Sequence, residues 1–276
     1  LYHWDMPLWL HERGGFKTSL AVEWFERFTK TMVDALSDRV QYWLTFNEPQ
    51  IFVGHGYQLG EHAPFEKLPQ REIQTISRNV MLAHGKAVRV IRKYAKTLPK
   101  VGVASTCDML LPVDGDEEKA YRATFDCTRN GVYNPAWWCD PMLAGKVPNG
   151  CDWLSEQDLK DIYEPLDFCA YNIYRADIAE GFNYTYTGMP RTTMDWTVTP
   201  ECMCYSAKFM YRRYGLPIMI TENGMANNDF VYEDGKVHDP QRSEYLKTHI
   251  KNLKRAADEG VPVIGYSCCS FLDNFE

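Results

Sequence analysis

The sequence contains no apolar run long enough to cross a membrane and no segment with the features of a signal peptide. It also lacks an excess of basic residues, because 30 Lys and Arg stand against 37 Asp and Glu, for a net charge of −7. This balance disfavours nucleic acid and anionic membranes as partners, since both attract positively charged proteins. The composition instead fits a protein that acts on a neutral substrate.

Paired cysteines with the spacing of a zinc site are absent as well. The nine cysteines are odd in number and lie mostly inside apolar runs. This distribution predicts buried, reduced thiols in a cytoplasmic protein. Cys202 and Cys204 are too few and too isolated to form a metal centre. We therefore expect no metal.

Apolar runs typical of buried strands alternate with segments of helical apolar spacing along the whole chain. The 276 residues allow one large domain or two small ones, and we expect a single domain over residues 1–276. The predicted helices are residues 19–36, 73–94, 117–128, 155–162, 201–214 and 240–259. The predicted strands are residues 40–46, 100–106, 167–174, 218–221 and 261–266. This alternation predicts an α/β fold with a parallel sheet.

Two predictions concern the faces of these helices. In residues 19–36 the apolar side chains at helical spacing predict the buried face. They are Leu20, Trp24, Phe28, Met32 and Leu36. His84 and His249 are expected on polar faces of their helices.

Strand ends occur at His3, Glu48, Thr106, Tyr174, Glu222 and after Tyr266. A closed (β/α)8 barrel needs eight strands, so these six predict an incomplete TIM barrel that contains strands three to eight. We expect a fragment without the first two strands and without the C-terminal end.

Two of these strands end in a glutamate. Residues 42–49 read Tyr-Trp-Leu-Thr-Phe-Asn-Glu-Pro, and residues 216–224 read Leu-Pro-Ile-Met-Ile-Thr-Glu-Asn-Gly. Barrel enzymes place their catalytic residues at the carboxyl ends of the strands, so Glu48 and Glu222 are expected at the same rim. Two carboxylates can cleave an acetal when one protonates the leaving oxygen and the other attacks the anomeric carbon. The acid then needs a raised pKa, and the nucleophile must stay ionised.

Further motifs extend this pattern in a fixed order: the opening Tyr-His-Trp-Asp-Met-Pro, the Gly-Tyr-Gln-Leu-Gly-Glu-His-Ala-Pro segment at 56–64, Asp140-Pro141, Asn172-Ile173-Tyr174 and the closing Leu-Asp-Asn-Phe-Glu. With Thr-Phe-Asn-Glu-Pro and Ile-Thr-Glu-Asn-Gly, they make the chain similar, over essentially its whole length, to the family-1 glycoside hydrolases. This is the β-glucosidase family.

The resemblance implies a (β/α)8 barrel and a retaining mechanism, with Glu48 as acid/base and Glu222 as covalent nucleophile. It implies no cofactor, and a small β-glycoside or oligosaccharide as the substrate. The implied supporting residues are His3 on the sugar 3-hydroxyl, Asn47 on the 2-hydroxyl, Asn172 in a supporting position, Tyr174 on the nucleophile, Trp196 on the aglycone side and Glu276 on the 4- and 6-hydroxyls.

The chain departs from the family pattern in two respects. Cys269 stands where the family has a tryptophan that stacks on the sugar, so we expect altered sugar binding with the mechanism kept. The residues that the family takes from its first two strands, a glutamine and an arginine, are not in the sequence, and neither is the tryptophan that follows Glu276.

Three alternatives remain open. A 6-phospho-β-glycosidase is disfavoured by Glu276, which would repel a phosphate. A barrel cellulase of another family does not account for the whole set of motifs. A catalytically silent carbohydrate-binding relative usually lacks one of the two glutamates, and both are present. The preferred sugar, the aglycone and the oligomeric state stay undetermined.

Overall fold

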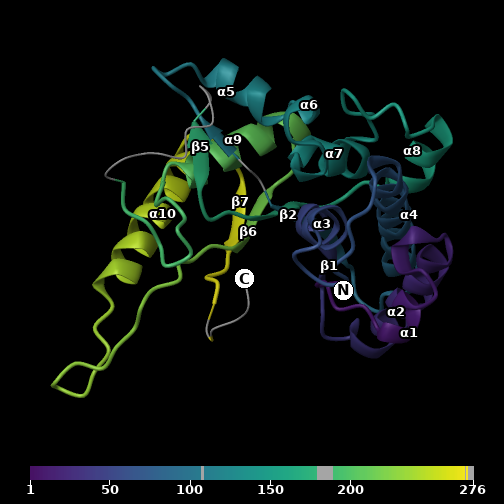
Figure 1. Ribbon diagram of the computed structural model, residues 1–276, viewed down its shortest axis with the longest axis horizontal. Helices are drawn as coiled ribbons and strands as arrows, with labels where there is room; N and C mark the ends of the chain where they lie inside the picture. Colours follow the sequence, from purple (N-terminus) through teal and green to yellow (C-terminus); the bar gives the residue numbers. More distant parts are fainter. Residues whose placement is uncertain (107–108, 179–188, 271, 273–276) are drawn as a thin grey trace. The chain divides into compact units, whose positions relative to one another are not determined.

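A computed structural model describes residues 1–106, 109–178, 189–270 and 272 (Figure 1). It divides into two compact units. The first unit comprises Leu1–Thr106 and Phe125–Ala170, and the second comprises Cys107–Thr124 and Tyr171–Glu276. The chain therefore passes between the units three times, and strand β4 (Cys169–Asn172) begins in the first unit and ends in the second.

The sheet of the first unit is built around a parallel pair, β1 (Tyr42–Asn47) and β2 (Lys100–Thr106). On one side of β1, Tyr2 forms a parallel bridge with Phe46. On the far side of β2, the Asp167 N–H donates to the Val101 carbonyl at 2.9 Å, just before β4 begins. The predicted strand ends at His3, Glu48 and Thr106 thus follow neighbouring parallel segments.

Two long helices, α2 (Leu20–Leu36) and α4 (Gln70–Tyr94), pack together in the first unit (Figure 1). Each follows a strand or strand-like segment and returns the chain to the start of the next, as in a βαβ unit. The shorter helices of this unit are α1 (Leu8–His11), α3 (Pro49–Val53), α6 (Cys127–Asn130), α7 (Pro135–Cys139) and α8 (Glu156–Ile162). Short 3-10 turns are η1 (Gly15–Lys17) and η3 (Gly131–Tyr133), and π-helical turns are η2 (Gly54–Leu59) and η4 (Asp140–Ala144).

Helix α2 forms where predicted, but it buries a different stripe. The buried residues are Ala21, Val22, Phe25, Thr29 and Val33. The predicted face is only partly covered, and Leu20 is 57% exposed. The predicted stripe repeats every four residues, while the helix repeats every 3.6, so the predicted stripe slants around the helix away from its core-facing side. The prediction of the buried face was wrong.

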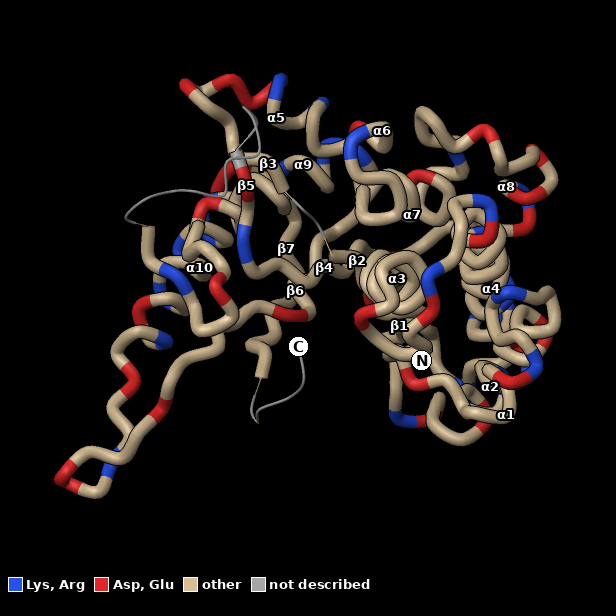
Figure 2. Tube along the Cα trace, in the orientation of Figure 1, with Lys and Arg blue, Asp and Glu red and all other residues tan. Residues whose placement is uncertain are grey.

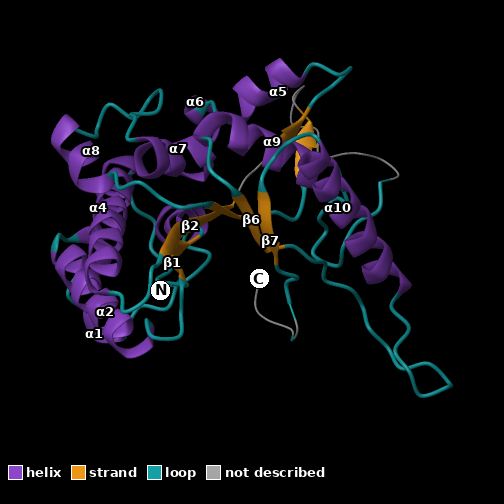
Figure 3. Ribbon diagram, turned by 180° about the vertical axis from the view of Figure 1, so that it is seen from behind, coloured by secondary structure: helices purple, strands orange, loops and turns teal. Residues whose placement is uncertain are grey.

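In the second unit, β6 (Ile218–Glu222) pairs in parallel with β7 (Val263–Tyr266), as Figure 3 shows from behind. The Ile173 N–H, just after β4, donates to the Glu222 carbonyl at 2.9 Å. A separate parallel pair joins β3 (Met109–Leu111) to β5 (Ala176–Ile178), which the sequence analysis did not predict. The helices are α5 (Glu117–Thr124), α9 (Cys202–Tyr214) and α10 (Pro240–Asp258).

The exposed side of α10 carries both acidic and basic residues (Figure 2). Lys254 pairs with Asp258 at 2.6 Å, and Arg255 pairs with Glu259 at 2.8 Å, both four residues apart. Such exposed pairs each stabilise a helix by only about 0.3–0.5 kcal/mol. The charged residues of α10 therefore keep its exposed side in contact with water and add little stability through ion pairs.

One predicted helix differs in detail. The predicted helix at 117–128 stops at Thr124, and a new helix starts after Asp126, whose side chain accepts the Thr128 N–H at 3.0 Å. The next predicted helix, at 155–162, is observed as α8, and Ser155 is its N-cap and forms a capping box with Asp158.

The predictions for two histidines were wrong, because His84 and His249 are both fully buried. The Nδ1 atom of His84 lies 2.7 Å from the hydroxyl of Thr45, and Nδ1 of His249 lies 2.7 Å from the carbonyl of Tyr245. Burial lowers the pKa of His84 to about 3 and that of His249 to about 4, so both rings are neutral. They are packed core residues with one hydrogen-bonded nitrogen each.

Candidate active site

Glu48 follows β1 directly and is the N-cap residue of α3. Its backbone is left-handed, with φ 43° and ψ 65°, a conformation that costs a non-glycine residue about 1–3 kcal/mol. Hydrogen bonds fix this turn on both sides: the Glu48 N–H donates to the Ala104 carbonyl and its own carbonyl accepts the Ile51 N–H, both at 2.9 Å. Pro49 occupies the first helical position, where no N–H is needed. Glu48 is only 7% exposed.

Two predicted sugar-binding residues meet beside this turn. The Nδ2 atom of Asn47 donates to Nε2 of His3 at 3.1 Å. Nearby, Nε1 of Trp4 donates to the Asn47 carbonyl at 3.0 Å, which ties the segment after Tyr2 to the end of β1. His3 is exposed and Asn47 half-buried, so both can reach a ligand.

Glu222 is the last residue of β6 and is held by side chains from the end of β4. The Tyr174 hydroxyl donates to Oε2 of Glu222 at 2.7 Å. The amide of Asn172 also donates to this carboxylate, and Oδ1 of Asn172 accepts the Thr221 hydroxyl at 2.6 Å. These contacts hold the carboxylate in one place.

Opposing effects act on the ionisation of Glu222. Burial raises the pKa of its carboxyl above the ordinary value, because the charged form loses solvent. The hydrogen bonds from Tyr174 and Asn172 act in the other direction, since they stabilise the carboxylate. Burial prevails, so the pKa of Glu222 lies above its usual range. The two donors limit this rise.

A second set of hydrogen bonds fixes the backbone around Glu222. Nδ2 of Asn223, which is fully buried, donates to the Ile173 carbonyl at 2.7 Å and its Oδ1 accepts the Tyr266 hydroxyl at 2.9 Å. The Tyr245 hydroxyl from α10 donates to the Tyr174 carbonyl at 2.9 Å. The ends of β4, β6 and β7 are therefore cross-linked immediately beside the carboxylate.

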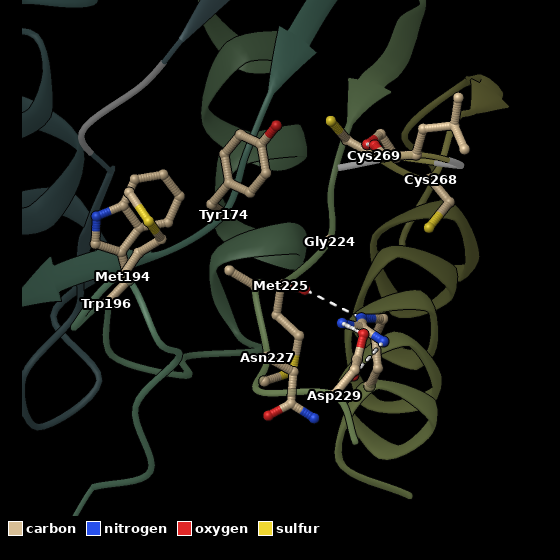
Figure 4. Close-up of a pocket in the computed structure, with 13 residues that line it drawn as sticks. Tyr174, Met194, Trp196, Gly224, Met225, Asn227, Asp229, Cys268 and Cys269 are labelled. Atoms are coloured by element: carbon tan, nitrogen blue, oxygen red, sulfur yellow. Dashed lines mark hydrogen bonds and ion pairs between the residues drawn. The ribbon is translucent and has the colours of Figure 1, made fainter. Parts of the chain in front are cut away.

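A cavity of about 420 Å³ in the second unit is lined by Tyr174, whose hydroxyl donates to Glu222, and by Gly224 (Figure 4). Trp196 and Met194 lie beside the ring of Tyr174 at one side, with the Tyr174 and Trp196 ring centroids 5.3 Å apart. Across the cavity, Cys268 and Cys269 line the opposite wall. An aromatic and thioether wall of this kind suits an apolar or sugar-ring face.

Gly224 lines this cavity, and glycine is required at this position. A side chain at this position would collide with the carbonyl of Cys269. The Cys269 N–H donates to the Asn223 carbonyl at 3.0 Å, so the segment after β7 packs directly on the turn after Glu222. Cys269 is half-exposed and Cys268 exposed, and both are free thiols.

The structure brings the predicted residues together in two groups. His3, Asn47 and Glu48 belong to the first unit, and Asn172, Tyr174, Trp196 and Glu222 belong to the second. Glu276 lies outside the described residues. Among the described residues, no cluster of three or more His, Cys, Asp or Glu is placed to hold a metal ion.

Sequence reasoning missed four residues of the second group: Thr221, Asn223, Tyr245 and Arg175. Thr221 and Asn223 flank Glu222 in sequence, which was the available signal. Tyr245 is 71 residues from the carbonyl that its hydroxyl binds, so no local pattern indicates it. The Arg175 guanidinium lies 5.9 Å from the Trp196 ring centroid, a cation–π contact that no spacing predicts.

The chain is similar in sequence and structure to several known proteins. β-Glucosidase A from Thermotoga maritima is 33% identical, over all of this chain and 64% of its own length. The 1,4-β-D-glucan glucohydrolase from Thermotoga neapolitana is 32% identical, over all of this chain and 68% of its own length. The solved structure of the Thermotoga maritima β-glucosidase in complex with deoxynojirimycin superimposes with a TM-score of 0.88 at 30% identity, over all of this chain and 64% of that one.

These likenesses confirm the predicted fold class, an α/β TIM barrel that is present here in part. The chain spans about two thirds of the length of these relatives. The sequence model described as "Glycosyl hydrolase family 1" matches residues 1–276, which is every residue of the chain. The chain therefore belongs to glycosyl hydrolase family 1.

Proposed function

We propose that this chain carries the catalytic residues of a retaining β-glycosidase that hydrolyses β-glucosides or similar small β-glycosides. The observation that carries the proposal is the carboxylate of Glu222, held at the end of β6 by donors from Tyr174 and Asn172. A covalent nucleophile must be ionised and oriented, and Tyr174, the donor to Glu222, also lines the cavity together with Gly224. The names of the relatives, β-glucosidase and glucan glucohydrolase, support the same activity.

In this mechanism Glu222 attacks the anomeric carbon and forms a glycosyl-enzyme intermediate. The leaving-group oxygen takes its proton from Glu48, which then activates water for the second step. Glu48 is buried beside the end of β1, which shields the proposed acid from bulk water. Retention requires the two carboxyl groups to be about 5–5.5 Å apart.

The remaining predicted residues take substrate-binding roles in this proposal. Asn47 and His3, already hydrogen-bonded to each other, would contact the 2- and 3-hydroxyls of the sugar. Trp196 would line the leaving-group side, where its ring faces the cavity. Glu276 keeps its proposed role on the 4- and 6-hydroxyls, and Cys269 would leave the sugar without one stacking face.

We further propose the domain organisation, the cellular compartment and the partners of the protein. The chain acts as a single catalytic domain over residues 1–276, within a longer protein, because it spans about two thirds of its relatives' length. The protein works in the cytoplasm, as its free cysteines suggest, and six of the eight described thiols are buried. No nucleic acid, membrane or cofactor takes part. In the described part of the chain, no helix is long and apolar enough to span a bilayer.

The proposal is tested with the complete protein and an aryl β-glucoside, by proton NMR of the first sugar released. Retention predicts that the β anomer appears first and then mutarotates. First release of the α anomer would rule out the retaining mechanism. An absence of any turnover on β-glucosides, β-galactosides and cello-oligosaccharides would favour the silent carbohydrate-binding relative.

A further inference from the structure

The segment that joins β6 to α10 projects beyond the first turn of α10 (Figure 1). We call its far part, residues 230–238, the tip loop. Exposed apolar side chains that gather in one place, rimmed by polar residues, mark binding surfaces. The tip loop has this composition, because the residues between its apolar side chains are charged or glycine. The exposed apolar residues are Phe230, Val231, Tyr232 and Val237.

Hydrogen bonds within the tip loop hold its shape. The Gly235 N–H donates to the Tyr232 carbonyl, and the Tyr232 N–H donates to the Lys236 carbonyl, both at 2.9 Å. Gly235 has a φ of 76°, which glycine adopts without strain. Oδ1 of Asp234 accepts the Lys236 N–H at 3.1 Å. The exposed side chains therefore stand on a defined turn.

Two aromatic rings of the tip loop support each other. The ring centroids of Phe230 and Tyr232 are 4.3 Å apart, with an angle of 32° between the planes. Tyr232 also contacts the ring of His238 at 5.0 Å, in an edge-on arrangement. Nε2 of His238 lies 2.7 Å from Oδ2 of Asp234, which fixes that ring in turn. Phe230 is nevertheless 59% exposed, so the pair presents a braced aromatic surface to solvent.

The base of the same segment forms one wall of the cavity described above. Met225 and Asp229 both line that cavity, and Phe230 is the next residue along the chain. Arg242 of α10 ties this base in place: its Nε donates to the Met225 carbonyl, and its guanidinium pairs with Asp229, both at 3.2 Å. Arg242 also pairs with Asp239, where the segment enters α10. The aromatic pair therefore begins one residue beyond the cavity wall, on an anchored base.

The chemistry of this surface favours a neutral, hydroxylated ligand. The guanidinium of Arg242 is balanced by two aspartates of the segment, and Asp234 is hydrogen-bonded to His238. A sugar ring offers an apolar face that fits one aromatic ring, and hydroxyls that bind polar neighbours. A specific protein–protein interface engages about 20–30 residues on each side, far more than the tip loop provides.

We propose that Phe230 and Tyr232 form a second sugar-binding site, on which the far units of a β-linked oligosaccharide stack after the chain leaves the cavity. This inference rests on the proposed function, in which Trp196 lines the leaving-group side of the scissile bond. A short glycoside occupies the cavity alone, whereas a long oligosaccharide also contacts the tip loop. Because the second contact is made within one bound molecule, it strengthens binding of long chains selectively.

The first test uses the complete protein and compares kcat/KM for cellohexaose with kcat/KM for a short aryl β-glucoside. Phe230→Ala should lower the ratio of the two values about three- to tenfold, the scale of one stacked aromatic contact. Phe230→Trp should keep the ratio, because it keeps an aromatic face. Phe65→Ala is the matched control, since Phe65 is an equally exposed phenylalanine of the first unit. The same ratio in Phe230→Ala as in the unchanged protein would overturn the inference and leave the proposed function intact.

The second test measures binding without turnover. A thio-linked cellohexaose, which resists hydrolysis, should shift the NMR signals of the 13C-labelled rings of Phe230 and Tyr232, whereas a methyl β-glucoside should not. Shifted rings in a protein that hydrolyses nothing would support the sugar site and contradict the proposed function. Rings that do not respond to the thio-oligosaccharide would overturn the inference. Self-association that is lost in Phe230→Ala, without any response to the sugar, would assign the tip loop to a protein contact and overturn it as well.

Discussion

The end of β1 in the first unit and the end of β6 in the second each present a glutamate, and the two are held by different means. Glu48 is placed by its backbone, which adopts a left-handed conformation and is hydrogen-bonded on both sides. Glu222 continues a regular strand, and side chains from neighbouring segments hold its carboxylate. The backbone of Glu48 leaves the strand in a turn, whereas the backbone of Glu222 continues the strand.

This difference suits the two proposed roles. An acid that donates and recovers a proton is served by a buried position, which Glu48 has. A nucleophile needs donors that favour its charged form against burial, which Tyr174 and Asn172 provide. The comparison therefore predicts that substitutions at the two ends affect activity, stability and pH dependence in different ways.

The largest effect is expected for Glu222→Ala in the complete protein. Loss of the covalent nucleophile should reduce kcat by roughly 10⁴-fold or more. A small anion such as azide should restore part of the turnover by attacking from the vacated side, and it should yield a glycosyl azide of inverted configuration, measured by NMR. Unchanged activity in Glu222→Ala would contradict the assignment of the nucleophile.

Glu48→Ala should behave differently, because only the proton donor is lost. Hydrolysis of substrates with poorly acidic leaving groups should slow by about 10²- to 10⁴-fold. Substrates with an acidic phenol as leaving group should be much less affected in the first step. Steady-state rates across a series of aryl β-glucosides measure this contrast, and a uniform loss across the series would argue against Glu48 as the acid.

Tyr174→Phe removes one donor from Glu222 and keeps the ring beside Trp196. A hydrogen bond to a charged group contributes about 1.5–3 kcal/mol, so kcat/KM should fall roughly 10- to 150-fold. The pKa of Glu222 should rise further, which would shift the acidic limb of the pH profile to higher pH. A loss of rate with an unchanged acidic limb would show that Tyr174 acts on something other than ionisation.

The stability difference between a glycine and an alanine variant should have opposite signs at positions 48 and 222, because the two backbones differ. At position 48, where φ is 43°, glycine should be more stable than alanine by about 1 kcal/mol. At position 222, which is in a strand, alanine should be more stable than glycine by about 0.5–1 kcal/mol. Denaturant midpoints of the four variants measure this. The same sign at both positions would disprove the contrast between turn and strand.

The smallest effect concerns stability and pH at Glu222. Because folding raises the pKa of its carboxyl, the folded state binds this proton more tightly than the unfolded state does. The corresponding stabilisation is fully present below the unfolded pKa and is lost as the pH rises through the folded pKa. Glu222→Gln should therefore gain stability relative to the unchanged chain as the pH rises from the unfolded pKa to the folded pKa, and none at lower pH. A constant difference over this range would contradict the raised pKa.

Much of the fold followed from the sequence, because parallel strands and their helices have distinct periodicities. The helices at 73–94, 201–214 and 240–259 lie within a few residues of α4, α9 and α10. The short pair β3 and β5 was missed, since two three-residue strands carry no readable period. The buried stripe of α2 was wrong because several apolar residues surround that helix, and only packing decides which of them face inward.

The candidate site was predictable only where it lies in short motifs. Glu48 and Glu222 follow strands and precede breakers, so local sequence indicates them. The contacts that set their chemistry are long-range: Tyr174 is 48 residues from Glu222, and Asn172 is 49 residues from Thr221. The positive φ of Glu48 runs against the local sequence, because a following proline favours an extended conformation in the residue before it.

Trapping of the covalent intermediate tests the central claim most directly. The complete protein is incubated with a 2-deoxy-2-fluoro-β-glucoside that has a good leaving group, which slows hydrolysis of the glycosyl-enzyme more than its formation. Proteolysis and mass spectrometry then locate the added sugar. The account predicts one fluoroglucosyl ester on the peptide that contains Glu222, stoichiometric with the loss of activity. A label on Glu48 or elsewhere, or inactivation without any label, would contradict it.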